Sequence, residues 1–129
     1  MQIKEVQEKL KISSYTLRYY ERVGLIPAVS RTSGGIRNYD DEALGWVENA
    51  ICMRSAGVPI EALIEYVKLF QEGDSTIQAR LELLQEQLAG LEEQKVHIES
   101  TMKRLNYKIS CYEKAVKTGK LVWDNCEEK

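Results

Sequence analysis

A stripe of aromatic and basic side chains is the part of this 129-residue sequence whose chemistry suits a polyanion. Residues three, four and seven apart lie on one face of a helix. That spacing joins Tyr15, Arg18, Tyr19 and Arg22. Arginine can give paired hydrogen bonds to phosphate or to a base edge, and tyrosine can bond a phosphate while its ring packs on a sugar or base. The stripe indicates a helix that contacts nucleic acid; the alternative is a solvated face whose tyrosines cover a core.

Two short helices joined by a polar turn are predicted to hold the stripe. Apolar residues at spacings of three and four predict a helix over residues 3–10. Ser13 or Ser14 can cap the next helix, and Gly24 can end it. Two helices and a tight turn within about residues 3–23 are the outline of a helix-turn-helix.

A small basic hairpin is predicted next, over residues 28–39. Its tip of Ser and Gly is flanked by Arg31 and Arg37. Residues 1–39 hold seven Lys or Arg and three Asp or Glu, a net charge of +4, whereas the rest of the chain holds eleven and seventeen, a net charge of −6. A basic projection beside a basic helix favours DNA as the polyanion and indicates that the hairpin is a wing.

Two more helices would complete a head over residues 1–72. Asp40 is a suitable N-cap for a helix over about residues 41–56. Pro59 suits the first turn of a helix over about residues 59–71. The sequence therefore predicts a compact, all-helical body beside the wing.

The clearest periodicity lies in residues 75–117, where apolar residues alternate steps of four and three for about six heptads with one polar break. The seam consists of Ile77, Leu81, Leu84, Leu88, Leu91, Lys95, Ile98, Met102, Leu105, Ile109, Tyr112 and Val116. A helix of this length spans about 60 Å at ~1.5 Å per residue and cannot bury its stripe on a small head. Because the loop residues of a helical hairpin are lacking, we expect an identical partner and a coiled-coil homodimer.

Lys95 stands near the midpoint of the seam. In an antiparallel dimer the two-fold axis would pass close to it, and it could reach Glu92 or Glu99 of the partner subunit and fix the register. The alternative is that Lys95 extends from the edge of the seam into solvent and does little. Residues 118–129 form a short tail that either packs back or stays loose.

Composition excludes several classes of protein. No run of about 18 apolar residues and no signal peptide is present, so we expect a cytoplasmic protein with no membrane partner. The three cysteines (Cys52, Cys111 and Cys126) form no CxxC, and His97 is the one histidine. We therefore expect no disulfide framework, no metal site and no cofactor. Cys111 falls at a coiled-coil c position and His97 on the same helix, so both should be exposed.

Three segments resemble the N-terminal signature of MerR-family transcription regulators. They are TLRYYERVGLIP (16–27), GIRNYDDEAL (35–44) and CMRSAGVPIEAL (52–63). The resemblance implies a mainly α protein with a winged helix-turn-helix head and an antiparallel coiled-coil dimer on a pseudo-palindromic operator. It also implies activation, in which the dimer distorts a promoter with an over-long spacer so that RNA polymerase can use it.

The resemblance also assigns the DNA contacts. The matching positions lie on the second predicted helix, which ends at Gly24 and which we call the reading helix, and on the wing. They are Thr16, Arg18, Tyr19, Tyr20, Arg31, Arg37 and Tyr39. Tyr20 and Tyr39 depend on the resemblance alone, since by pattern they could equally be core residues.

Cys52 is the candidate effector-sensing residue. Its surroundings and IEALIEYVKLFQEGDST (60–76) resemble the NmlR/AdhR subgroup, which responds to aldehydes and other thiol-reactive electrophiles. By residue type, a cysteine in mid-helix is more often buried and inert. A regulator that responds to a small ligand, or acts constitutively, therefore stays as an alternative. A coiled-coil adaptor that never touches DNA is another alternative. A further one is an enzyme with Cys52 as nucleophile, which would have only His97 as a base.

Overall fold

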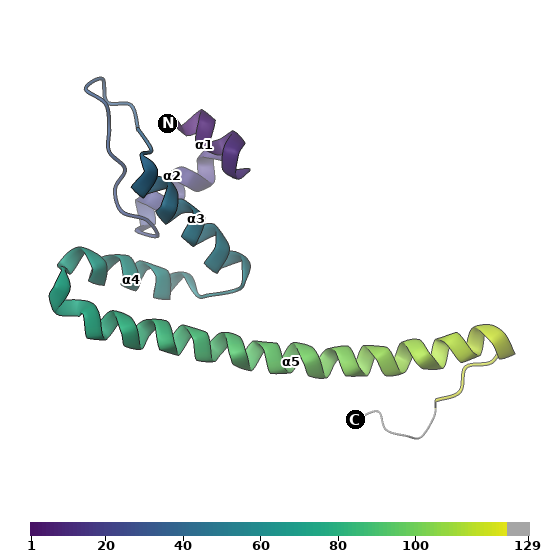
Figure 1. Cartoon of the computed structure of the whole chain (residues 1–129). Helices are drawn as coiled ribbons and strands as arrows, with labels where there is room; N and C mark the ends of the chain where they lie inside the picture. Colours follow the sequence, from purple (N-terminus) through teal and green to yellow (C-terminus); the bar gives the residue numbers. More distant parts are fainter. Residues whose placement is uncertain (124–129) are drawn as a thin grey trace. The chain divides into compact units, whose positions relative to one another are not determined.

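The computed structural model describes residues 1–123, and helices make up most of them (Figure 1). In chain order the elements are α1 (Ile3–Leu10), α2 (Ser14–Val23), α3 (Asp41–Ser55), α4 (Ile60–Glu72), the short 3-10 helix η1 (Asp74–Thr76) and α5 (Ile77–Thr118). Within the described residues, β-pairing is limited to an isolated antiparallel bridge between Arg31 and Arg37. The predicted fold class, a helix-turn-helix head followed by a long C-terminal helix, is confirmed.

The first two helices end where the sequence predicts, because their caps are local. The hydroxyl of Ser13 accepts the backbone N–H of Thr16 at 3.1 Å and so caps α2. Gly24 ends the helix with φ of +90°, a left-handed conformation that costs glycine least. The side chains of Val6 and Leu17 are fully buried and join α1 to α2. This packing fixes the helix-turn-helix.

The next two helices carry the rest of the head's core. Asp40 caps α3 as predicted, with its carboxylate accepting the N–H of Ala43 at 2.9 Å. Pro59 is the N-cap of α4 and not, as predicted, part of its first turn. Trp46 of α3 packs edge-on against Phe70 of α4, with ring centroids 5.1 Å apart. Such aromatic pairs add to the burial of apolar surface that holds two helices together.

Arg80 ties the start of α5 to the end of α4. Its Nε donates to the hydroxyl of Thr76 and its Nη2 to the carbonyl of Gly73, each at 3.0 Å, and its guanidinium lies 5.3 Å from the ring centroid of Phe70. Ser75, the first residue of the predicted long helix over 75–117, lies within η1 instead, and α5 begins two residues later. One compact unit therefore runs from Met1 to Leu88, beyond the predicted boundary near residue 72, and a second begins at Ala89.

The apolar seam of α5 is open in the single chain. Its predicted apolar members are all exposed, from 46% at Leu84 to 84% at Val116, except Leu91, which is half-buried. Soluble proteins seldom leave so many large apolar side chains in water without a partner. The exposure agrees with a helix that packs against something outside this chain.

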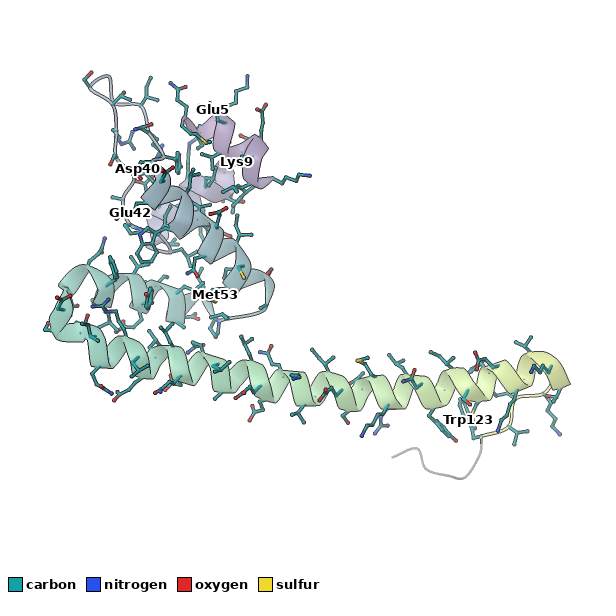
Figure 2. The ribbon with its side chains drawn as sticks, in the orientation of Figure 1. Glu5, Lys9, Asp40, Glu42, Met53 and Trp123 are labelled. Atoms are coloured by element: carbon teal, nitrogen blue, oxygen red, sulfur yellow. The ribbon has the colours of Figure 1, made fainter. Side chains whose placement is uncertain are left out.

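Residues 119–123 fold back on the end of α5, where Figure 2 shows Trp123 against the helix. The ring of Trp123 stacks on Tyr107, with centroids 6.1 Å apart, and meets Tyr112 edge-on at 5.9 Å. Cys111, one turn after Tyr107, is only 1% exposed. The prediction that Cys111 is exposed was wrong, because the heptad position took no account of the returning tail.

Candidate nucleic-acid interface

The predicted stripe lies on the outer face of α2. Tyr15 is 72% exposed, and Arg18 and Arg22 are exposed as well. Tyr19 is half-buried, with the guanidinium of Arg22 5.4 Å from the centroid of its ring, so the charge is held over the aromatic face. Thr16 is half-buried in the first turn of the helix. In a helix-turn-helix, the second helix is the one that enters the major groove, and these side chains are on it.

The wing is present, but its two sides share less β-pairing than the two strands of a regular hairpin. The N–H of Thr32 donates to the carbonyl of Ile36 at 2.8 Å, and the N–H of Gly35 donates back to the carbonyl of Thr32 at 2.9 Å, which closes a tight turn. The Nη1 of Arg31 donates to the carbonyl of Gly35 at 2.8 Å, so this side chain runs along the wing toward its tip. Both predicted wing arginines therefore flank the turn, as the sequence indicated.

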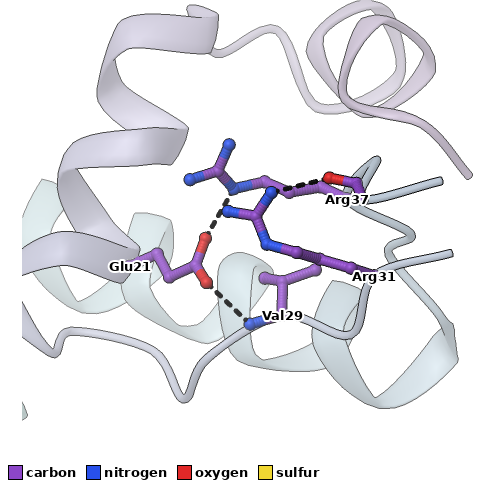
Figure 3. Close-up of polar contacts among 5 residues, drawn as sticks. Glu21, Val29, Arg31 and Arg37 are labelled. Carbon is purple, nitrogen blue, oxygen red and sulfur yellow. Dashed lines mark hydrogen bonds and ion pairs between the residues drawn. The ribbon is translucent and has the colours of Figure 1, made fainter. Parts of the chain in front are cut away.

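Glu21 of α2 holds the base of the wing (Figure 3). Its Oε1 accepts a hydrogen bond from Nε of Arg37 at 2.7 Å, and its Oε2 accepts the backbone N–H of Val29 at 2.9 Å. Burial alone would raise the pKa of Glu21, but the hydrogen bonds from Arg37 and Val29 and the charges of Arg37 and Arg31 outweigh it. The pKa is lowered, so the carboxylate stays ionised.

Tyr20 and Tyr39 lie in the core beneath the interface, at 9% and 1% exposed. Burial raises the pKa of both phenols. The positive charge of Arg54 partly offsets the rise at Tyr20, and the positive charge of Arg37 partly offsets it at Tyr39. The buried hydroxyl of Tyr39 has no hydrogen-bond partner within the described residues. The interpretation of these two positions as core residues is therefore correct for the free chain, and the DNA contacts that the resemblance gives them stay a prediction.

The side chain of Cys52 is exposed on α3, contrary to the burial expected from its residue type. Its carbonyl accepts the hydroxyl of Ser55 at 2.7 Å, and its thiol is open to solvent. His97 is exposed, as predicted, and Cys126 lies outside the described residues. In the part of the chain that the structure describes, no three His, Cys, Asp or Glu side chains are grouped as a metal ion needs, and no helix is long and apolar enough to cross a membrane.

Sequence reasoning missed Glu21. A signal was present, because Glu21 is the one acid between Lys9 and Tyr39, a stretch rich in Lys and Arg. An isolated acid in a basic segment is often an ion-pair partner. Its two partners, Val29 and Arg37, are eight and sixteen residues away, and only the folded chain identifies them.

An exposed arginine and tyrosine stripe on the second helix of a helix-turn-helix, next to a basic wing, defines a DNA-binding protein of the winged helix-turn-helix class. Residues 1–69 match the family described as MerR HTH family regulatory protein. The chain belongs to this family and is a DNA-binding transcriptional regulator, not an enzyme.

Transcriptional regulators of similar sequence support this family assignment. The HTH-type transcriptional regulator AdhR of Bacillus subtilis is 55% identical over 84 residues, which cover 65% of this chain and 60% of AdhR. The match therefore leaves more than a third of AdhR uncompared. An HTH-type transcriptional regulator of Haemophilus influenzae is 33% identical over 112 residues, 87% of this chain and 83% of that protein.

Solved structures are similar over nearly the whole chain. A MerR family transcriptional regulator from Listeria monocytogenes has a TM-score of 0.87 and 41% identity, covering 92% of this chain and 90% of that one. HiNmlR, described as a MerR family regulator lacking the sensor domain and bound to promoter DNA, has a TM-score of 0.84 and 31% identity, covering 92% and 94%. The predicted resemblance to the NmlR/AdhR subgroup is confirmed by these two names together.

Proposed function

We propose that this chain works as a homodimer that binds a pseudo-palindromic operator within a promoter. In its activated form the dimer distorts the DNA so that RNA polymerase can start transcription. One observation carries the proposal: the same chain presents an exposed reading helix beside a wing and an exposed seam of apolar residues. The similarity to HiNmlR, which is bound to promoter DNA in its structure, supports the DNA contact.

The dimer follows from the exposed seam of α5. A second copy would cover the same stripe on both chains, as a two-fold interface requires. In an antiparallel arrangement Lys95 lies near the axis, where it meets Glu92 or Glu99 of the partner subunit. Two heads then present their α2 helices to the two halves of an inverted repeat.

The effector is a thiol-reactive electrophile, such as an aldehyde, and Cys52 is its target. The exposure of this thiol in the single chain supports the assignment, because a reagent can reach the sulfur. So does the similarity to AdhR over the stretch that matches. The sulfur of Cys52 adds to the carbonyl carbon of the aldehyde, the C=O double bond becomes a C–O single bond, and the thiol proton passes to that oxygen to give a hemithioacetal. The adduct adds bulk on α3, and a dimer with two forms of similar energy would shift toward one of them.

DNA binding is tested with duplexes selected by the unaltered protein from a random pool, with dissociation constants measured by fluorescence anisotropy at several salt concentrations. We expect an inverted repeat and a steep loss of affinity with salt. Arg18→Ala should weaken binding about tenfold, because an exposed arginine is lost from the reading helix. Lys68→Ala, which removes an exposed lysine from α4, should bind as the unaltered protein does. A protein that enriches no duplex would be the coiled-coil adaptor instead.

Sensing is tested in cells that carry a reporter gene behind the selected operator, with formaldehyde as the added electrophile. We expect Cys52→Ala to lose the response and Cys111→Ala, at a buried thiol, to keep it. A Cys52→Ala protein that still responds would remove the thiol mechanism and leave a regulator that binds a small ligand. A reporter that formaldehyde never alters would indicate constitutive action.

A further inference from the structure

We propose that Glu21 is a positioning residue for DNA binding: its carboxylate fixes the wing on the reading helix and aims Arg37 at a phosphate. The inference rests on the proposed DNA binding. It gives a role to an acidic side chain whose negative charge would otherwise only weaken the binding of DNA. It concerns the free head, since every contact involved lies within one chain.

Glu21 joins α2 to both ends of the wing. Glu21 projects from α2, the helix that carries the stripe, and its two oxygens serve opposite sides of the wing. Val29 lies where the chain enters the wing, and Arg37 lies where it leaves (Figure 3). Because the wing has only one β-bridge of its own, it lacks a sheet that would hold it in place. The carboxylate therefore substitutes for sheet pairing at the base of the wing.

The guanidinium of Arg37 is oriented by its hydrogen bond to Glu21. A guanidinium is planar and rigid, so a bond that fixes Nε also fixes the direction of Nη1 and Nη2. Nε of Arg37 is bonded to Glu21 at 2.7 Å, whereas the two terminal nitrogens have no partner drawn in Figure 3. The side chain of Arg37 is 25% exposed, which leaves those nitrogens able to meet a phosphate oxygen. Glu21 thus holds the arginine in the orientation that a phosphate needs.

A carboxylate in a basic surface repels a polyanion, so by charge alone the loss of Glu21 should strengthen DNA binding. The positioning role makes the opposite prediction. The two accounts therefore differ in the sign of the effect, which an affinity measurement reads directly.

Glu21→Gln is the decisive variant. Glutamine has nearly the same shape, but it replaces one acceptor oxygen with an NH₂ donor, which then faces either Nε of Arg37 or the N–H of Val29. One of the two contacts is lost while the negative charge is also removed. Glu8→Gln is the matched control, since it removes the same charge from an exposed side chain on α1.

The measurement uses the full chain and the inverted-repeat duplex that the unaltered protein selects. We expect Glu21→Gln to bind about tenfold more weakly, with the slope of log affinity against log salt reduced by about one as the Arg37 phosphate contact is lost. Glu8→Gln should bind as tightly as the unaltered protein or slightly more tightly. Circular dichroism at the assay temperature establishes that each variant is fully folded, so that a lower affinity does not reflect unfolded protein.

Arg37→Lys provides a second route, which also decides the matter if Glu21→Gln does not fold. Lysine keeps the charge but is a point donor that cannot serve Glu21 and a phosphate in fixed directions. We expect a comparable loss of affinity, and little further loss when Glu21→Gln is added, because the two residues act as one unit.

Two results would overturn the inference. If Glu21→Gln is folded and binds at least as tightly as the unaltered protein, with an unchanged salt slope, Glu21 does not position the interface. If it does not fold, unaltered affinity in Arg37→Lys leads to the same conclusion. A protein that selects no duplex at all would be a different failure, of the proposed function itself.

Discussion

Glu21 links the charge of the interface to the stability of the head. Its carboxylate is mostly buried, with a side chain 13% exposed, and both oxygens are engaged. Single residues of this kind are difficult to find from sequence, because their partners are set by tertiary structure. The exposed stripe of α2 was predictable, since helical spacing alone places its members on one face.

The lowered pKa of Glu21 predicts a stability that depends on pH. A carboxyl whose pKa is lower in the folded state stabilises the fold above its ordinary pKa of about 4.3. That contribution is lost as the pH falls below this value and through the lowered pKa. Urea unfolding should show Glu21→Gln to be less stable by about 1 kcal/mol at pH 7. The gap should shrink on acidification toward pH 3, and a gap of constant size would contradict the ionised clamp.

At the scale of elements, the helices follow local signals closely and the turns between them follow tertiary contacts. Asp40 and Gly24 mark helix ends in the sequence and in the structure alike. The start of α5 was misplaced because the buried hydroxyl of Thr76 organises η1 through contacts with the carbonyls of Leu69 and Gly73 at 2.6 and 2.8 Å. Nothing in the local sequence separates Thr76 from Ser75 as a cap.

Two glycines should respond to alanine in opposite ways. Gly24 has φ of +90°, which an alanine adopts only under strain, while its added Cβ would make an ordinary contact with Ile64 at 3.7 Å. Gly45 lies inside α3 with nothing within 4 Å of an added Cβ. Thermal or urea unfolding should show Gly24→Ala less stable by about 1 kcal/mol and Gly45→Ala more stable by about 0.5–1 kcal/mol. Equal effects at the two sites would refute the left-handed cap.

The packing of residues 119–123 on α5 should limit the access of reagents to the thiol of Cys111. Trp123 stacks on Tyr107 and meets Tyr112 edge-on, and the buried Cys111 lies between these two tyrosines in sequence, so we expect the removal of Trp123 to expose that thiol. In a chain with Cys52 and Cys126 changed to serine, Trp123→Ala should raise the rate of Cys111 with a disulfide reagent about tenfold. Val122→Ala, at an exposed neighbouring position, is the control. An unaltered rate for Trp123→Ala would show that something else covers the thiol.

At the scale of the whole molecule, sequence periodicity predicted the long helix well, because a heptad pattern depends only on spacing. Periodicity could not show how the seam is buried, because in a homodimer the surface that covers it is the seam of a second, identical chain. The exposure of apolar positions along α5 agrees with the predicted dimer. The sequence was compatible with a tail that packs back and with one that stays loose, and its described part packs on its own helix through Trp123.

A charge placed in the seam should separate the two chains. Leu91→Lys puts an ammonium into the apolar interface twice, once from each copy, and an unpaired buried charge is costly. Sedimentation equilibrium should show self-association weakened on the order of a hundredfold, with DNA affinity falling alongside. Glu93→Lys, at an exposed position off the seam, is the matched control and should stay dimeric. Dimers of undiminished strength in Leu91→Lys would place the interface elsewhere.

The stoichiometry of the DNA complex tests the central claim most directly. Sedimentation velocity with a labelled, selected duplex measures how many chains travel with each DNA molecule. Two chains per duplex, with free protein that is already dimeric at micromolar concentration, is the predicted result. One chain per duplex, or a free protein that sediments as a single subunit and ignores every inverted repeat, would contradict the account.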